Sequence, residues 1–196
     1  MEKQDAGITL REALAGFLLA NDLGDGGYDA RWVDLGARPV PMVFPNTAGY
    51  ARAMRIHDLH HVLTGYATSP SGEYEIASWE LGSGCAGHVE AWAFNLLGLG
   101  LGGLRWPRAT LTAFRAGRAS RNLFTERYDD HLLDQRVGET RRRLGLPVAL
   151  DSPAVGDYAR FGATFLAGFT LAVLFLCAVA PVLAATATLV AKRRSR

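Results

Sequence analysis

The alternation of hydrophobic and polar positions predicts a chain that is almost entirely helical. Over residues 8–20 the apolar side chains fall roughly on one side of a helix, which predicts a short amphipathic helix. Residues 28–45 lack this period, and three prolines in the stretch prevent a long helix, so an irregular and extended segment is expected there. No strand pattern persists in the sequence beyond Val40 to Phe44.

Capping residues set the bounds of two helices in the middle of the chain. Asn46 or Thr47 can cap a helix that runs to about Leu63, where a glycine follows at position 65. Ser69 precedes a proline at a typical first helical position, so another helix is expected to start at residue 70. The two helices are joined by a short turn.

Three further segments complete the predicted helical domain. Residues 86–104 are apolar and rich in glycine, which fits either a helix buried in the core or one that touches lipid. A helix is expected from residue 107 to about Ala116. A longer amphipathic helix is predicted from about Asn122 to Arg143, because apolar side chains recur at helical spacing among its many charges. The pattern as a whole predicts an all-α fold.

The last part of the chain is strongly apolar. From Phe161 to Ala191 there are 31 consecutive residues without a charge, more than the roughly 20 that cross a bilayer core. As a helix this run would be about 46 Å long, so a tilt or a bend near Pro181 is expected. The predicted organisation is a compact helical metal-binding domain over residues 1–150, a transmembrane helix over residues 160–191 and a basic tail over residues 192–196.

The distribution of charge favours membrane lipid over nucleic acid as a partner. The chain carries 21 basic and 19 acidic residues, but four of the basic ones follow the apolar run, which leaves 17 against 19 in the rest. A body so close to neutral offers no broad basic face for phosphates, so no nucleic-acid partner is expected. The basic tail is typical of residues that flank a membrane span.

The cysteines and the N-terminal residues indicate the cellular compartment of the helical domain. Cys177 falls inside the apolar run and Cys85 outside it, so no disulfide is expected and a reducing compartment is favoured. The first residues lack the form of a cleaved signal peptide. The body is therefore expected in the cytoplasm, on a single-pass C-terminal anchor, although basic residues at both ends of the run leave its orientation open. The spacing of Gly168 and Ala172 suits helix packing, which allows a homo-oligomer.

The helix expected after Thr47 carries residues suited to metal binding. On such a helix His57, Asp58 and His61 lie on one face, while the neighbouring His60 points away. Glu73 follows beyond the turn, where an antiparallel second helix can bring it back as a fourth ligand. Imidazole nitrogens and carboxylate oxygens suit zinc, iron or manganese. These four residues predict a metal site. Glu75 and Glu80 are alternatives to Glu73 as the carboxylate ligand from the second helix.

This spacing resembles the HDxxHx11E zinc motif of the coenzyme Q (ubiquinone) biosynthesis proteins. The match covers residues 57–65, then Gly72-Glu73 and, more loosely, Trp79-Glu80. A second stretch, residues 122–128 running on into residues 141–145, is similar to the family's C-terminal helix with its aromatic-Glu-Arg signature. The resemblance spans about residues 45–147 and implies an all-helical fold, membrane association and Zn²⁺, or another divalent metal, on four ligands: His57, Asp58, His61 and Glu73.

The resemblance also implies a substrate and partners. The family acts on polyprenylated quinone precursors, through C1 decarboxylation of a polyprenyl hydroxybenzoate, and organises the other quinone-biosynthesis proteins at the membrane. Arg127 is the candidate for binding an anionic group of the substrate, with a surface ion pair to Glu126 or Asp130 as the alternative. The chain departs from the family at Ala77, where a lysine is common, and in its long apolar tail. Another lipid quinone is therefore an alternative substrate.

Three other interpretations compete with this one. The histidine boxes of membrane di-iron desaturases would need more histidines, since only two lie outside the cluster. The metal site of HD phosphohydrolases would need a histidine upstream of His57, and none precedes it. The third is a non-enzymatic, membrane-anchored scaffold that binds lipid quinones. A site closed by four protein ligands favours such a structural role, whereas an open coordination position favours catalysis.

Overall fold

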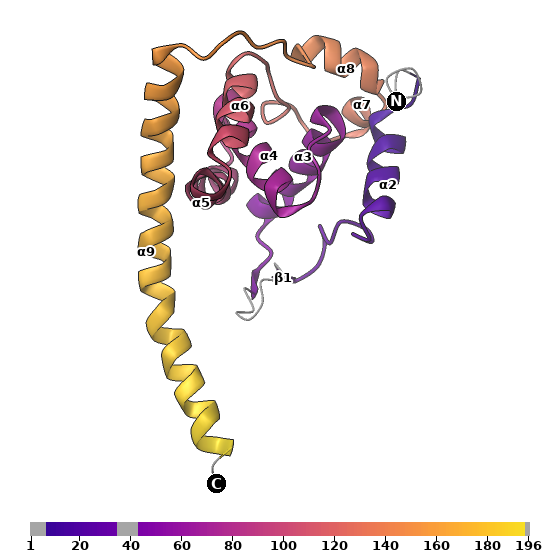
Figure 1. Cartoon of the computed structure of the whole chain (residues 1–196). Coiled ribbons are helices and arrows are strands. Elements are labelled where there is room, and N and C mark those ends of the chain that lie inside the picture. The colour runs from indigo at the N-terminus through magenta and orange to yellow at the C-terminus, as the bar shows by residue number, and fades with distance from the viewer. Residues whose placement is uncertain (1–6, 35–42, 195–196) are drawn as a thin grey trace.

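Helices dominate the computed structural model, which describes residues 7–34 and 43–194, and for residues 179–194 the helix path alone. Most of them gather into one body, and a long C-terminal helix runs beside this body and extends well past it (Figure 1). The predicted all-α class with a C-terminal helix able to span a membrane is confirmed.

The bounds of the elements follow the predicted pattern in most places. The helices are α2 (Leu10–Ala20), α3 (Ala48–Thr64), α4 (Pro70–Ser83), α5 (Val89–Arg105), α6 (Pro107–Arg118), α7 (Asp130–Leu133), α8 (Val137–Leu144) and α9 (Val155–Arg194). Strands β1 (Trp32–Asp34) and β2 (Val43–Pro45) pair antiparallel, with Val33 opposite Phe44. The segment predicted to be extended therefore holds a pair of short strands. Of the strand pattern at Val40 to Phe44, residues 40–42 lie outside the described part of the chain.

Local capping explains the bounds of the two helices that build the site. The Thr47 side chain accepts a hydrogen bond from a backbone N–H of the first turn of α3, and Gly65 ends this helix in the left-handed region at φ 79°. Ser69 caps α4 in the same way, with Pro70 in its first turn. Because the connection is short and sharply turned, the start of α4 returns to the last turns of α3.

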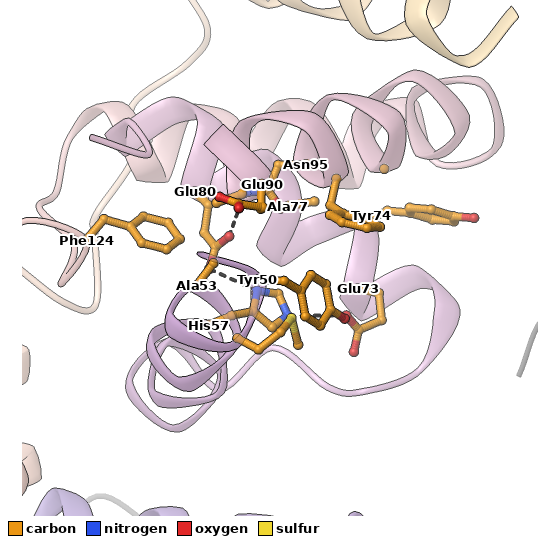
Figure 2. Close-up of a pocket in the computed structure, with 14 residues that line it drawn as sticks. Tyr50, Ala53, His57, Glu73, Tyr74, Ala77, Glu80, Glu90, Asn95 and Phe124 are labelled. Atoms are coloured by element: carbon orange, nitrogen blue, oxygen red, sulfur yellow. Dashed lines mark hydrogen bonds and ion pairs between the residues drawn. The ribbon is translucent and has the colours of Figure 1, made fainter. Parts of the chain in front are cut away.

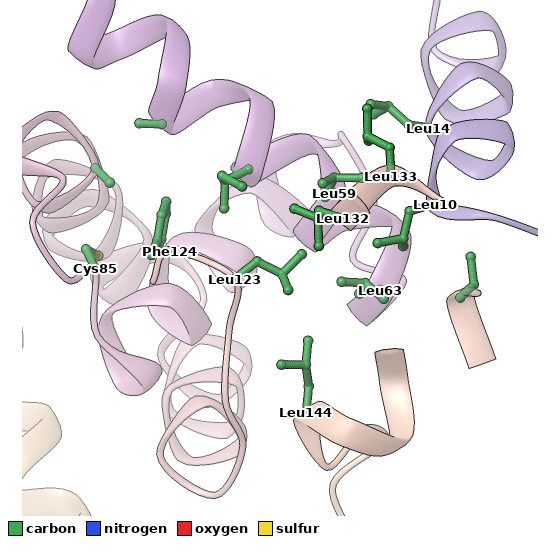
Figure 3. Packing of buried hydrophobic residues seen from close by; sticks show 14 of the residues in the cluster. Leu10, Leu14, Leu59, Leu63, Cys85, Leu123, Phe124, Leu132, Leu133 and Leu144 are labelled. Carbon is green, nitrogen blue, oxygen red and sulfur yellow. The ribbon is translucent and has the colours of Figure 1, made fainter. Parts of the chain in front are cut away.

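The core runs through the whole body, and one part of it lies where α2, α3, α7 and α8 meet. Buried leucines from these helices pack together (Figure 3): Leu10, Leu14, Leu59, Leu63, Leu132 and Leu144. Arg141 of α8 also donates hydrogen bonds to the carbonyl oxygens of Val62 and Leu63, both at 2.9 Å. The end of α3 is thereby held from outside the helix, since these carbonyl groups have no partner within it.

The prediction of one long helix from Asn122 to Arg143 is wrong. Residues 119–129 form a loop, and the short helices α7 and α8 follow it. In the loop, the Asn122 side chain accepts a hydrogen bond from the N–H of Phe124, and the N–H of Leu123 donates to a histidine of α3. These bonds compete with helical ones. They place Leu123 and Phe124 in the core, which explains their apolar spacing without a helix.

α9 is attached to the body through α5. A Cβ atom on Gly168 would lie 2.3 Å from the carbonyl oxygen of Leu96, so glycine at this position lets the two helices touch backbone to backbone. α9 begins at Val155, ahead of the predicted start at residue 160, and includes residues 192–194 of the predicted basic tail. Within the described residues, its segment Val155–Ala178 is the one stretch long and apolar enough to cross a membrane.

Candidate metal centre

His57, His61 and Glu73 converge between α3 and α4. The two histidines stand one turn apart on α3, and Glu73 enters from the first turn of α4. The Nε2 atoms of His57 and His61 are 3.2 Å apart, and they lie 3.5 and 3.4 Å from the two carboxylate oxygens of Glu73. All three side chains can therefore offer a ligand atom to one metal ion.

The outer nitrogens of both histidines are engaged by groups that can only accept a hydrogen bond. The Nδ1 atom of His57 lies 3.0 Å from a carboxylate oxygen of Glu80, and that of His61 lies 2.9 Å from the backbone carbonyl oxygen of Tyr66. A carboxylate and a carbonyl place the ring proton on Nδ1 in each case. Both Nε2 atoms then present lone pairs toward each other, as the histidine ligands of metal sites do.

Two lone pairs at this separation repel each other unless a proton or a cation lies between them. Burial lowers the pKa of His57, but the adjacent Glu80 and Glu73 carboxylates outweigh it and raise this pKa well above its ordinary value. Burial raises the pKa of Glu73, but both histidines, when they also carry a proton on Nε2, donate to its carboxylate and lower this pKa to about 2. The group therefore holds its carboxylate charged and favours a positive charge at its centre.

Glu80 forms a buried layer behind the histidines. Its side chain is 1% exposed and accepts hydrogen bonds from Nδ1 of His57, from Nδ1 of His60 at 2.7 Å and from the Asn95 amide at 2.6 Å. Burial raises the pKa of Glu80, but the two histidines outweigh it and lower this pKa far below its usual range. Carboxylates in this position orient histidine ligands and increase their basicity.

The sequence leaves Glu80 as an alternative ligand to Glu73. In the structure Glu80 instead lies behind the histidine rings, at their Nδ1 atoms. It stands two helical turns after Glu73, on the same side of α4. That spacing could have suggested that both carboxylates reach the histidines of α3. His60 points away from the group, as predicted, because its Nε2 atom accepts the N–H of Leu123 at 3.0 Å while its Nδ1 atom donates to Glu80.

Two other predicted site residues lie apart from the three that converge. Asp58 is buried, but its carboxylate accepts a hydrogen bond from the Tyr28 hydroxyl and is not among the atoms that meet at the centre. Burial raises the pKa of Asp58. The Arg127 side chain is 90% exposed, with Nε 3.9 Å from a carboxylate oxygen of Asp129. Its role toward an anionic substrate group stays a prediction.

A cavity of about 290 Å³ lies next to the centre, between α3, α4 and α5 (Figure 2). His57 and Glu73 form part of its wall, and apolar side chains form most of the rest. We call it the apolar cavity; besides His57 and Glu73 it is lined by Tyr50, Ala53, Met54, Tyr74, Ala77, Ala91, Phe94, Gly98 and Phe124, and by the polar residues Glu80, Glu90 and Asn95. Its size and lining suit a small aromatic ring with an apolar substituent.

A second cavity of about 380 Å³ reaches the same centre from the segment between α2 and α3. We call it the loop-side cavity. All three converging residues line it, together with more polar groups, among them Tyr28, Asp34, Asn46 and Asp58. His57 and Glu73 thus belong to the walls of both cavities.

Comparison with known protein families, curated proteins and solved structures finds no match to this chain. The chemistry of the centre therefore rests on its own geometry. Two imidazoles and one carboxylate are a ligand set found in catalytic zinc sites, where a further coordination position is open to substrate or water.

Proposed function

We propose that this chain is a membrane-anchored, metal-dependent protein of ubiquinone biosynthesis that removes the C1 carboxyl group of a polyprenyl hydroxybenzoate. Zn²⁺ is the proposed metal, and other divalent ions suit the same ligands. Other quinone-biosynthesis proteins are its proposed partners, with the body on the cytoplasmic side. One observation carries the proposal: two oriented histidines and a carboxylate converge on the wall of an apolar cavity.

The donor atoms of the three converging residues are of the kinds that bind a divalent metal ion. Two Nε2 lone pairs and an ionised carboxylate face one another, and each histidine is fixed by a second hydrogen bond. A divalent metal bound there would act as a Lewis acid toward an oxygen of the substrate. The proposed ligands are His57, His61 and Glu73, and the family resemblance adds Asp58 as a further prediction.

The residues of the cavity have separate roles in the proposed reaction. The aromatic ring and the first part of its isoprenoid chain lie against Met54, Phe94 and Gly98, which exclude water. Burial raises the pKa of Tyr50 to about 12, so its hydroxyl stays protonated near neutral pH and can donate a hydrogen bond to a substrate oxygen. Glu80 holds the His57 ring in place. The bond between C1 and the carboxylate breaks, carbon dioxide leaves, and a proton takes its place on the ring.

Rescue of a strain that lacks the gene tests this function. Wild type, His61→Ala and His131→Ala would be expressed in it, and quinone intermediates would be measured. His131 is the matched control because it is an exposed histidine outside the site. We expect the carboxylated precursor to accumulate with His61→Ala alone.

Full rescue by His61→Ala at equal protein levels would refute the enzymatic role. The non-enzymatic scaffold would then be the better account. The three converging side chains argue against that alternative, because a site made of these three ligands without Asp58 leaves a coordination position open.

A further inference from the structure

α9 is longer than a membrane span, and its contacts divide it into two parts. One side of α9 contacts the body as far as Ala172, the last buried residue in the described part of this helix, while its other side is exposed. Val173 and most of the residues up to 178 are exposed. From residue 173 to the end of the apolar run at Ala191 there are 19 residues. At ~1.5 Å per residue they extend about 28 Å, close to the ~30 Å of a hydrocarbon core. The part of α9 before Val173, although apolar enough to cross a membrane itself, therefore lies along the body with one side covered.

The body part of α9 holds α5 firmly in place. A Cβ atom on Gly100 would lie 2.5 Å from the backbone of Gly168, and one on Gly103 would lie 2.5 Å from the ring of Phe165. α5 is also packed against α4, where a Cβ atom on Gly102 would meet the Tyr74 side chain at 2.4 Å. Two sides of α5 are thus covered by other helices at very close range.

The third side of α5 is uncovered and apolar. Leu97, Leu101 and Leu104 follow one another at helical spacing; Leu97 is half-buried, and Leu101 and Leu104 are 43% and 61% exposed. In Figure 1, α5 is seen nearly end-on beside α9, with α4 and α6 on its other sides. The side of α5 that no helix covers in this view is the one toward which the free part of α9 continues.

Basic and aromatic residues border the end of this apolar surface. Arg105 lies over the ring of Trp106, with 5.2 Å from its guanidinium carbon to the ring centroid. Both Arg105 and Arg108 are exposed. Tryptophan and arginine are typical of the headgroup level of a bilayer, where the ring is half immersed and the charge meets phosphates.

We infer that Leu97, Leu101 and Leu104, which we call the α5 stripe, lie on the surface of the lipid bilayer. The stripe is next to Gly100 and Gly103, which pack against α9 shortly before its free part, so lipid comes close to the stripe once that part crosses the membrane. The axis of α5 is then roughly parallel to the membrane surface. The body contacts the bilayer directly and is not connected to it through α9 alone. This inference does not depend on the reaction that the centre performs.

Fluorescence quenching of the full chain in lipid vesicles tests this inference. Cys177 would be changed to serine, and single cysteines would replace Leu101, Leu104 or Val155 and carry an environment-sensitive dye. The remaining thiol, Cys85, is fully buried. Val155 is the matched control, since it is an exposed apolar residue of α9 at the end away from the span. Quenchers would be spin-labelled lipid and aqueous iodide.

We expect dyes at 101 and 104 to emit at shorter wavelength, to lose fluorescence with spin-labelled lipid and to resist iodide. The dye at 155 should show the opposite response. Equal quenching by iodide at all three positions would overturn the inference. So would protection of 101 and 104 from both quenchers together with crosslinking between chains, because a second copy would then cover the stripe.

Discussion

Replacing Glu80 by glutamine keeps both histidines but removes the carboxylate that orients His57. It therefore tests how much metal binding depends on this orientation. The glutamate accepts hydrogen bonds from His57, His60 and Asn95 inside the body. A glutamine has one acceptor oxygen in place of two and no charge, so it cannot accept from all three. Each buried polar group left without a partner costs about 1–3 kcal/mol. The fold should survive with a lower stability.

The larger effect of Glu80→Gln should be on the metal. Loss of a carboxylate that supports a histidine ligand weakens metal binding about 10–100-fold, which corresponds to roughly 1.4–2.8 kcal/mol. We expect this increase in the dissociation constant of Zn²⁺, measured by competition with a chelating indicator on the full chain in detergent. Glu75→Gln is the control, because this residue is on the same helix but its carboxylate lies outside the network.

An unchanged zinc affinity in Glu80→Gln, with the helical content of wild type, would refute this account of the centre. It would mean that the hydrogen bond to Nδ1 does not orient His57. A loss of affinity in Glu75→Gln as large as in Glu80→Gln would also contradict it, since the effect would then be one of overall charge.

Three further predictions concern the ligands, the helix contact and the response to pH. Asp58→Ala should weaken zinc binding less than His61→Ala in the same competition assay, because the carboxylate of Asp58 is turned away from the centre. Gly168→Leu should lower the melting temperature and expose α9 to protease, whereas Gly162→Leu should not, since a Cβ atom there meets nothing within 4 Å. Burial raises the pKa of Cys85 to about 12, so unfolding experiments should show stability falling as the pH rises from about 9 to 12, where the unfolded state alone loses this proton. Cys85→Ala should reduce that slope.

Each of these predictions has a result that would contradict it. Equal losses of zinc affinity in Asp58→Ala and His61→Ala would place Asp58 among the ligands, as the family resemblance implies. Equal protease sensitivity in Gly168→Leu and Gly162→Leu would show that the contact between α5 and α9 contributes little to the body. An unchanged slope in Cys85→Ala would assign the loss of stability at high pH to other buried groups.

The parts of the fold that could be predicted from the sequence are those fixed by neighbours along the chain. Thr47 and Ser69 cap their helices through bonds within one turn, so they are visible in the sequence itself. The convergence of His57, His61 and Glu73 follows from helical spacing and one short turn. These features are local, and the structure agrees with them.

The parts that could not be predicted depend on contacts between distant residues. Residues 122–129 have a helical pattern, but the N–H of Leu123 bonds to His60, 63 positions earlier in the chain. Glu80 has the spacing of a ligand, but its position behind the rings depends on His60 and on Asn95 of α5. No periodicity records such bonds, which explains both the wrong helix and the unexpected place of this carboxylate.

His57 and Glu73 face two cavities at once. An occupant of the apolar cavity therefore leaves the loop-side cavity as a second approach to these two residues. A molecule with a long tail can occupy the apolar cavity while a small molecule, such as water or a gas, enters through the loop-side cavity. The two then meet at the shared wall without passing each other. For the proposed lipid substrate, exchange of the small molecule then does not require the tail to withdraw, so the substrate can remain in place while the small molecules around it are replaced.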